Sequence, residues 1–290
     1  MWNAECGMRN AECGMRSERE RHMFRTLIFY AVLFLHYLRQ NLKVKLAYRG
    51  NFLIGAVSTI VYGVINITFL WTFFSRIPTL KGWTFEEVLL MYGVGEATFG
   101  LFAIFFFTFS SHLSWYYIIE GNLDRVLTRP INPFFQVMME NMNLNDIIIV
   151  LKGGVILIYV SGPLALKWTF VNIAGVALFI ISGALVYAGM FTTVASLSFW
   201  VKNREGLISP LYTLNEYSRF PMTVYPLPVR IFMSWVLPFA FVAFYPSVFI
   251  VGKSPLFPAS FATPFVSLLV FLVGYLTWRA GLRRYESSGS

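Results

Sequence analysis

The side chains best suited to catalysis or metal binding are few and scattered in this sequence. The three histidines are His22, His36 and His112, and the carboxylates form neither an H-E-x-x-H motif nor a D-x-D pair. Zinc sites and metallohydrolases need such ligands at close spacing. We therefore expect no catalytic residue, no metal site and no bound cofactor on this chain.

The only two cysteines, Cys6 and Cys13, lie in a heptapeptide, NAECGMR, that occurs at residues 3–9 and again at residues 10–16. No histidine lies between them, and no further cysteine follows, so they match neither a zinc motif nor a redox motif. We interpret residues 1–22 as a disordered tail. A duplicated coding segment or a start codon placed too far upstream would produce it.

A second motif imitates nucleotide chemistry. Gly252, Lys253 and Ser254 read GKS, the end of a phosphate-binding loop. The glycine that this loop requires five residues earlier is replaced by Ser247, and no strand–loop–helix pattern surrounds the motif. We therefore expect that this chain binds no ATP, and that any ATP and Mg would bind to a separate ATPase.

Charged residues gather instead in residues 120–135, EGNLDRVLTRPINPFF. Gly121 suits the end of a preceding helix, because glycine adopts the left-handed conformation at little cost. Asn122 is placed to cap a short helix over residues 123–128, which must end before Pro130. A short, charged helix with fixed ends would suit docking into a cleft of a soluble partner. An ordinary solvated loop is the alternative.

The rest of the sequence is strongly apolar. It is 57% hydrophobic and only 13% charged, with 30 Phe and 8 Trp among 290 residues, and its mean hydropathy is +0.63. One soluble core cannot hold this composition. A hydrocarbon layer of about 30 Å is crossed by about 20 apolar helical residues. The sequence thus predicts an all-α integral membrane protein, and its five clearest spans are residues 51–74, 87–109, 146–166, 171–200 and 260–278.

Between the last two of these spans lies an apolar region with seven prolines, residues 205–257, which is too long for a single span. We predict a sixth transmembrane helix at residues 206–220, followed by re-entrant outer helices within residues 229–251. Such backbone is tolerated at membrane depth where protein or a wet cavity surrounds it. The alternative places the span at residues 229–251 and leaves residues 201–228 as a cytoplasmic loop.

The distribution of basic residues predicts the orientation. With six spans and both termini in the cytoplasm, the inner segments hold 16 Lys and Arg residues, whereas the outer loops hold five. Cytoplasmic flanks carry such an excess. We therefore expect a multi-pass protein of the cell inner (plasma) membrane and no nucleic-acid partner, since no basic face with interleaved aromatics is present. The outer five are Arg76, Lys81, Lys167, Arg230 and Lys253.

Residues 23–48 combine large apolar side chains with basic ones such as Arg25, Arg39 and Lys43. The run is too polar to cross a membrane. A helix of this composition suits the inner headgroup layer, where basic side chains extend toward anionic lipid. The sequence thus predicts an interfacial helix before the first span.

Three charged residues within the predicted spans form the candidate translocation path: Glu96, Glu216 and Arg219. A charge at the centre of a span costs about 2.5–3.5 kcal/mol, so Glu96 should face a polar cavity or a partner. It would contact a substrate or, alternatively, accept an interhelical hydrogen bond from a group such as Asn66. Glu216 and Arg219 are three residues apart, which permits an ion pair on one helix face.

The charged segment also carries a family resemblance. EGNLDRVLTRPINPFFQ resembles the signature loop of permeases in the type-2 ABC exporter superfamily, where a Gly, a Leu-Asp pair and an Arg-Pro-x-Asn-Pro run follow the second span. The stretch RFPMTVYPLPVRIFMSWVLPFAFVAFYPS is similar to the Pro-rich region after span five, and RRYESSGS is similar to the basic C-terminus of these proteins. The likeness covers nearly all of residues 23–290, which we interpret as one transmembrane permease domain.

This resemblance implies a permease subunit of an ATP-driven exporter, with an elbow helix over residues 23–48, a cytoplasmic coupling helix and re-entrant outer helices. It implies dimerisation with an identical or similar permease and two separate ABC ATPase subunits, which would bind ATP and Mg. The implied ATPase-coupling loop consists of Gly121, Leu123, Asp124, Arg125, Arg129, Pro130, Asn132 and Pro133. The alternative is an ATP-independent secondary transporter or channel, which would show inverted repeats and ion-coordinating charges at the midplane.

Overall fold

The computed structural model describes residues 2–201, 208–253 and 260–287, with side chains from residue 24 onward. Within this described part the chain forms helices and turns, with no β-strand. It divides into two units, Met1–Tyr48 and Arg49–Ser290.

The first unit is a single helix, α1 (Trp2–Ala47). Among its described side chains, Leu27, Ile28 and Leu35 are exposed apolar groups, and Arg25 and Arg39 are exposed on the same helix. That this helix lies at a membrane interface stays a prediction. The boundary placed between residues 22 and 23 stays a prediction.

Among the described residues, the second unit contains five helices that are long and apolar enough to cross a membrane, or six candidates if the bent pair Leu227–Val236 and Phe239–Val251 counts as one span. The five clearest predicted spans thus coincide with candidate membrane helices, with ends that differ by a few residues at most positions. The exception is the second, which runs ten residues beyond the predicted end. The helices are α2 (Arg49–Phe74), Phe85–Ile119 beginning with α3 (Phe85–Phe102), Leu144–Ser161 including α7 (Ile147–Ser161), Phe170–Phe199 including α8 (Phe170–Ser196), and α13 (Thr263–Leu282).

The second span extends because its polar residues continue the helix rather than end it. π-Helical turns occupy Ala103–Phe107 and Leu113–Ile119, on either side of α4 (Thr108–His112). Gly121, with φ of +76°, lies just beyond the end. Only glycine adopts this conformation without strain, so the helix ends where the sequence predicted a glycine stop.

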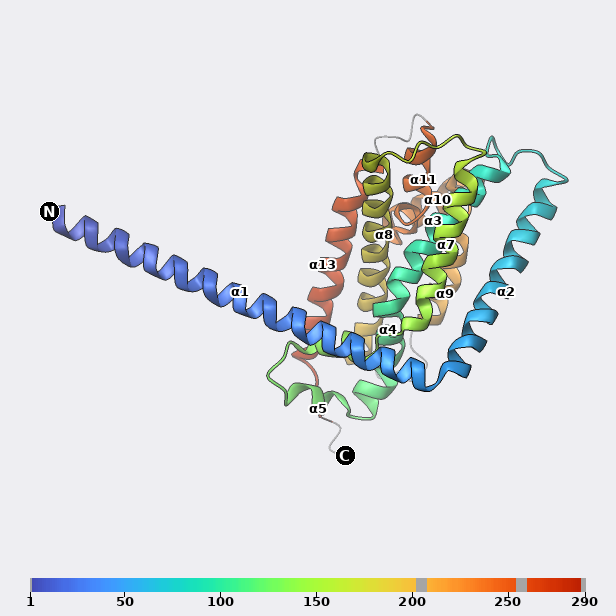
Figure 1. Ribbon diagram of the computed structural model, residues 1–290. Helices are drawn as coiled ribbons and strands as arrows, with labels where there is room; N and C mark the ends of the chain where they lie inside the picture. The colour runs from blue at the N-terminus through green and yellow to red at the C-terminus, as the bar shows by residue number, and fades with distance from the viewer. Residues whose placement is uncertain (1, 202–207, 254–259, 288–290) are drawn as a thin grey trace. The chain divides into compact units, whose positions relative to one another are not determined.

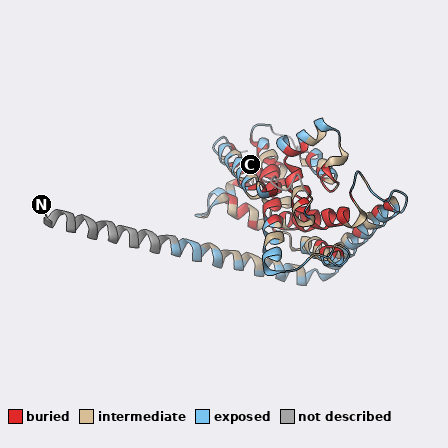
Figure 2. Ribbon diagram, turned by 90° about the horizontal axis from the view of Figure 1, so that it is seen from above, coloured by how far each residue is buried: buried red, intermediate tan, exposed pale blue. Residues whose placement is uncertain are grey.

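The helix α3 forms the centre of this unit. In the helical stretch Phe85–Ile119 that begins with α3, 89% of the most apolar 18-residue window is buried, against 11% for α2, and the buried residues gather in the middle of the bundle (Figure 2). Gly93 and Ala97 on α3 pack against Gly153 on α7, where an added Cβ would lie 2.5 Å from the Ala97 nitrogen. Small residues thus let α3 and α7 approach closely.

The helices before α13 are short and are interrupted by turns. It contains α9 (Ile208–Tyr217), α10 (Leu227–Ile231) and α11 (Phe244–Val251). The helical stretches around α10 and α11 meet at a 77° bend. Pro238 lies in the break, and a proline cannot donate the hydrogen bond that would continue a helix. Residues 206 and 207 of the predicted sixth span lie outside the described residues.

Both ends of this bent pair lie at the turn between α2 and α3. Before it, the Thr223 and Val224 carbonyls accept from Lys81 Nζ at 3.3 and 3.2 Å. After it, Lys253 Nζ lies 2.7 Å from the Gly82 carbonyl oxygen. In Figure 1, α10 and α11 lie at one end of the bundle and α5 lies at the other.

The residues of the GKS motif that the structure describes have local roles. Gly252 has φ of +73° and ends α11. Lys253 pairs with Glu87 at 2.6 Å and lies 4.1 Å from the centre of the Trp83 ring. The lysine is therefore held within the fold. Ser254 lies outside the described residues.

Candidate functional site

The predicted charged helix exists as α5 (Leu123–Leu127) and is followed by α6 (Pro133–Glu140). The predicted Asn122 cap is wrong: the residue has helical backbone angles, and its Nδ2 donates to the Tyr116 carbonyl at 3.0 Å. A side-chain cap requires non-helical backbone. Asn132 meets that condition with ψ of 118°, and its Oδ1 accepts from the backbone N–H groups of the first turn of α6.

One face of α5 is buried. Leu123 and Val126 are fully buried and pack in one apolar cluster with Tyr117, Val137 and Trp278. Apolar contact with several helices fixes a five-residue helix that would not form alone. Arg125 and residues 127–130 remain exposed.

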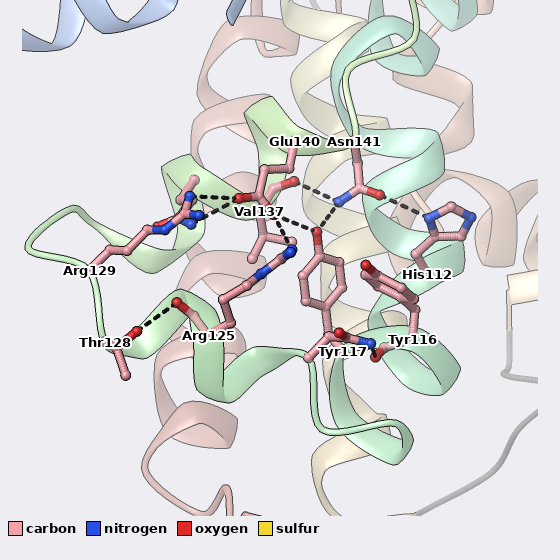
Figure 3. Close-up of polar contacts among 11 residues, drawn as sticks. His112, Tyr116, Tyr117, Arg125, Thr128, Arg129, Val137, Glu140 and Asn141 are labelled. Carbon is pink, nitrogen blue, oxygen red and sulfur yellow. Dashed lines mark hydrogen bonds and ion pairs between the residues drawn. The ribbon is translucent and has the colours of Figure 1, made fainter. Parts of the chain in front are cut away.

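Glu140, at the end of α6, collects the polar contacts of this region (Figure 3). Its Oε1 lies 3.3 Å from Arg129 Nη1, and its Oε2 lies 3.5 Å from Arg125 Nη2. Gln136 Nε2 donates to Oε1 at 2.9 Å, and the Tyr117 hydroxyl donates to Oε2 at 3.3 Å. The two arginines of the predicted coupling loop are thus tied to one carboxylate of their own chain.

A second layer of hydrogen bonds joins α6 to the long second span. Asn141 Nδ2 donates to the Tyr117 hydroxyl and to the Val137 carbonyl, each at 2.8 Å. Its Oδ1 lies 2.9 Å from His112 Nδ1. Figure 3 shows this chain of contacts running from His112 to the arginines. The loop is therefore an ordered part of the bundle.

The outermost residues of the loop are Leu127 to Pro130, all exposed. Leu127 is 41% exposed although it is apolar. Asp124 is half-buried and accepts a hydrogen bond from Ser287 Oγ at 2.6 Å. Of the predicted loop, then, Leu123 is internal, Asp124, Arg125 and Arg129 are paired within the chain, and Pro130 is on the surface.

The second candidate site is a buried cluster of charges around Glu96. Its Oε1 lies 2.7 Å from Arg219 Nη1, and its Oε2 lies 2.8 Å from Lys152 Nζ. Arg219 Nη2 also contacts Glu216 Oε1 at 3.2 Å, so the predicted Glu216–Arg219 pair is confirmed. The structure brings all three predicted residues together and adds Lys152 from α7. We call these four residues the buried charge cluster.

Asn66 is not a partner of Glu96, so that suggestion is wrong. Its Nδ2 donates to the Tyr62 carbonyl of its own helix at 2.8 Å. Two cations satisfy Glu96 instead, and hydrogen bonds between ionised groups are stronger than those to a neutral amide. Two acids and two bases make the buried charge cluster neutral, which is what a low-dielectric setting demands.

A cavity of about 220 Å³ borders the buried charge cluster. Its walls come from α2, α3 and the region of α9, and they include Asn66, Phe69, Tyr92, Glu216 and Arg219. The guanidinium of Arg219 lies 5.6 Å from the centre of the Tyr92 ring. The cavity therefore combines aromatic walls with one ion pair.

Sequence reasoning missed Glu140, Asn141, Lys152 and Ser287. A signal existed for Lys152, because a lone lysine within a span requires a buried acid. A weaker one existed for Glu140, the acid next along the chain after two arginines. Ser287 gave none, since 163 residues separate it from Asp124.

A family described as ABC-2 family transporter protein matches residues 60–289 of the chain. The match includes both candidate sites and most of the sequence, so the chain belongs to this family, as the loop resemblance indicated. It is an ABC-2 type permease, a multi-pass membrane transport protein of the kind that forms a membrane subunit. No curated protein and no solved structure matches the chain.

Proposed function

We propose that the chain is the membrane-spanning permease subunit of an ATP-driven exporter. It works as a dimer with an identical or similar permease and with two ABC ATPase subunits, which bind ATP and Mg. The observation that carries the proposal is α5: a short, charged helix fixed to the spans by Leu123, Val126 and Glu140. Members of the family typically partner with ATPase subunits.

In this proposal α5 is the coupling helix, and its exposed end docks into a cleft on the ATPase. Leu127 is the apolar contact, because 41% exposure of a leucine is costly without a partner. Displacement of α5 reaches the spans through Trp278 on α13 and Tyr117 on the second span. ATP energy enters as a difference in binding between the two transporter states.

The proposed topology has six crossings with both termini in the cytoplasm of the inner (plasma) membrane. The bent pair around α10 and α11 is re-entrant, because both its ends contact the α2–α3 turn. The remaining crossing uses α9, about 15 Å long, and the chain from Arg219 to Thr223. Arg219 pairs with Glu96. On α3, Glu96 lies about 14 Å along the helix axis from Glu87, at 1.5 Å per residue. The unit α1 serves as the elbow helix at the inner headgroups.

The proposed translocation path passes the cavity beside Glu216 and Arg219. Closure of the motor domains would shift α9 relative to α3, and Glu96 would keep the two helices joined through Arg219. An ATP-independent transporter or channel is the weaker candidate. Its ion site would need unpaired charges at the midplane, whereas Glu96 is fully engaged by Lys152 and Arg219.

The test is co-purification of the full chain with the ABC ATPase encoded by the neighbouring reading frame. We expect the wild type to retain the ATPase and to stimulate its ATP hydrolysis. Leu127→Ala should lower retention about tenfold, since a central apolar contact is worth more than 1 kcal/mol. Ile77→Ala is the matched control, because Ile77 is 43% exposed and lies in the turn between α2 and α3, away from the α5 loop in sequence. A wild type that retains no ATPase overturns the proposal.

A further inference from the structure

The chain beyond α13 returns to α5. Ser287 Oγ donates a hydrogen bond to Asp124 Oδ2 at 2.6 Å across a sequence separation of 163 residues. Asp124 lies in the first turn of α5. The last described residues of the chain therefore contact the helix that the proposed function assigns to coupling.

A second contact supports this one. Tyr285 is partly buried and packs in the apolar cluster that also holds Leu123, Val126 and Phe199. Its ring centre lies 6.3 Å from that of Phe199. Burial, followed by the Asp124 carboxylate, raises the pKa of Tyr285 to about 12, so the phenol stays neutral at cellular pH.

The neighbours of Tyr285 point outward. Arg283, Arg284, Glu286 and Ser287 are exposed, whereas Tyr285 is half-buried. The segment thus has one inward-facing ring and one hydroxyl bonded to Asp124. This pattern distinguishes it from a solvated end of the chain, which would make neither contact.

We propose that residues 283–287 form a clamp that positions α5, with Ser287 acting on Asp124 and Tyr285 on the apolar face. The role in coupling rests on the proposed function, whereas the clamp itself is a property of the isolated chain. α5 has five residues and cannot hold its own conformation. Its ion pairs to Glu140 involve arginines that are half exposed, and such pairs are weak. The clamp adds a hydrogen bond to an ionised carboxylate, which is stronger than a neutral one.

The clamp gives Asp124 a different role from the one that the family resemblance implied. The family resemblance made this carboxylate part of the surface that meets the ATPase. The structure pairs it with Ser287 of the same chain, so its effect on the ATPase is indirect. Asp124 and Ser287 are therefore positioning residues, and the contact with the ATPase falls to the residues from Leu127 to Pro130.

The first test needs no ATPase. Amide hydrogen exchange is measured on the full chain in lipid nanodiscs, for wild type, Ser287→Ala, Ser287→Thr and Glu286→Ala. We expect Ser287→Ala to exchange about fivefold faster over residues 124–128, as loss of one hydrogen bond predicts. Ser287→Thr keeps the donor and should match the wild type. Glu286→Ala, an exposed neighbour, should also match it. Equal exchange in Ser287→Ala and wild type overturns the clamp.

The second test separates positioning from docking in the complex with the ATPase. Ser287→Ala leaves Leu127 in place, so we expect ATPase retention to stay within twofold of the wild type. Stimulated ATP hydrolysis should fall about fivefold, and Ser287→Thr should restore it. If the complex with Ser287→Ala hydrolyses ATP as fast as the wild-type complex, the positioning role is contradicted. If the wild type retains no ATPase, the proposed function fails, while hydrogen exchange still decides whether the clamp exists.

Discussion

Glu96 and Glu140 each hold two basic side chains, but in opposite surroundings. Glu96 has a side chain only 2% exposed, and its partners lie at 2.7 and 2.8 Å. Glu140 is 17% exposed, its partners lie at 3.3 and 3.5 Å, and both arginines are about half exposed. A glutamate carboxylate thus pairs with two basic side chains at both sites, once buried within the bundle and once near its end.

The difference shows what each cluster is suited to do. Breaking a buried pair leaves an uncompensated charge away from water, which is strongly destabilising. The exposed pairs of Glu140 compete with water and salt, so they contribute little to stability. A weak pair can exchange its partner when another protein docks. We infer that Glu96 holds the spans together, whereas Glu140 holds a helix whose contacts must change.

The largest expected effect comes from neutralising Glu96. Glu96→Gln leaves Lys152 and Arg219 buried with one acid, and we expect a loss of about 3–5 kcal/mol in stability. Glu96→Gln/Lys152→Met makes the cluster neutral again and should recover most of that loss. Thermal unfolding in detergent, followed by size-exclusion chromatography, measures both. Two variants as stable as the wild type would show that the buried charge cluster has no structural role.

A smaller effect distinguishes Arg219 from Glu216. Arg219→Glu removes one partner of Glu96 and sets a second carboxylate against it, whereas Glu216→Arg changes a residue whose side chain is 33% exposed. We expect Arg219→Glu to lose about 3 kcal/mol and Glu216→Arg about 1 kcal/mol.

The double reversal sharpens this comparison. A simple Glu216–Arg219 pair would be restored by exchanging the two charges. Because Arg219 also serves Glu96, we expect the double variant to stay as unstable as Arg219→Glu alone. Thermal unfolding of the three variants measures their stability. Full recovery of wild-type stability in the double variant would show that the Glu96–Arg219 pair does not contribute to it.

The smallest effect on stability is expected at the end of the bundle. Glu140→Gln is the same chemical change as Glu96→Gln, yet it should cost at most about 1 kcal/mol. Salt should matter only here: raising ionic strength from 0.1 to 1 M shortens the screening length from about 10 to about 3 Å. Hydrogen exchange over residues 124–128 should rise with salt in the wild type and respond less in Glu140→Gln. Equal salt responses in the wild type and in Glu140→Gln would show that the ion pairs of Glu140 do not stabilise α5.

Much of the fold could be predicted from local sequence. Hydropathy located five spans, because a helix in lipid must be apolar along its whole length. Gly121 and Pro130 bracketed α5, since both act on the backbone within one or two residues. The predicted Asn122 cap failed, because asparagine suits the position by type and only the backbone angles in the folded chain exclude it.

The contacts between distant segments could not be predicted in the same way. Hydropathy left two readings of residues 201–251 with the same parity, and it could not indicate the contacts that Lys81 makes with Thr223 and that Lys253 makes with Gly82. Glu96 lies between Lys152 on α7 and Arg219 in the turn after α9. Ser287 contacts Asp124 across a sequence separation of 163 residues. Such pairs depend on packing, and no local pattern encodes them.

Glu96 is inferred to hold the spans together, and Glu140 is inferred to hold α5 for coupling. Both inferences are tested by comparing Glu96→Gln with Glu140→Gln in the assembled complex. Both are purified with the ATPase from the neighbouring reading frame, and stability and stimulated ATP hydrolysis are measured on the same samples. We predict that Glu140→Gln unfolds like the wild type but loses most of the stimulation, while Glu96→Gln loses stability first. Wild-type stimulation in a stable Glu140→Gln complex would contradict the account, because α5 would then not carry the coupling.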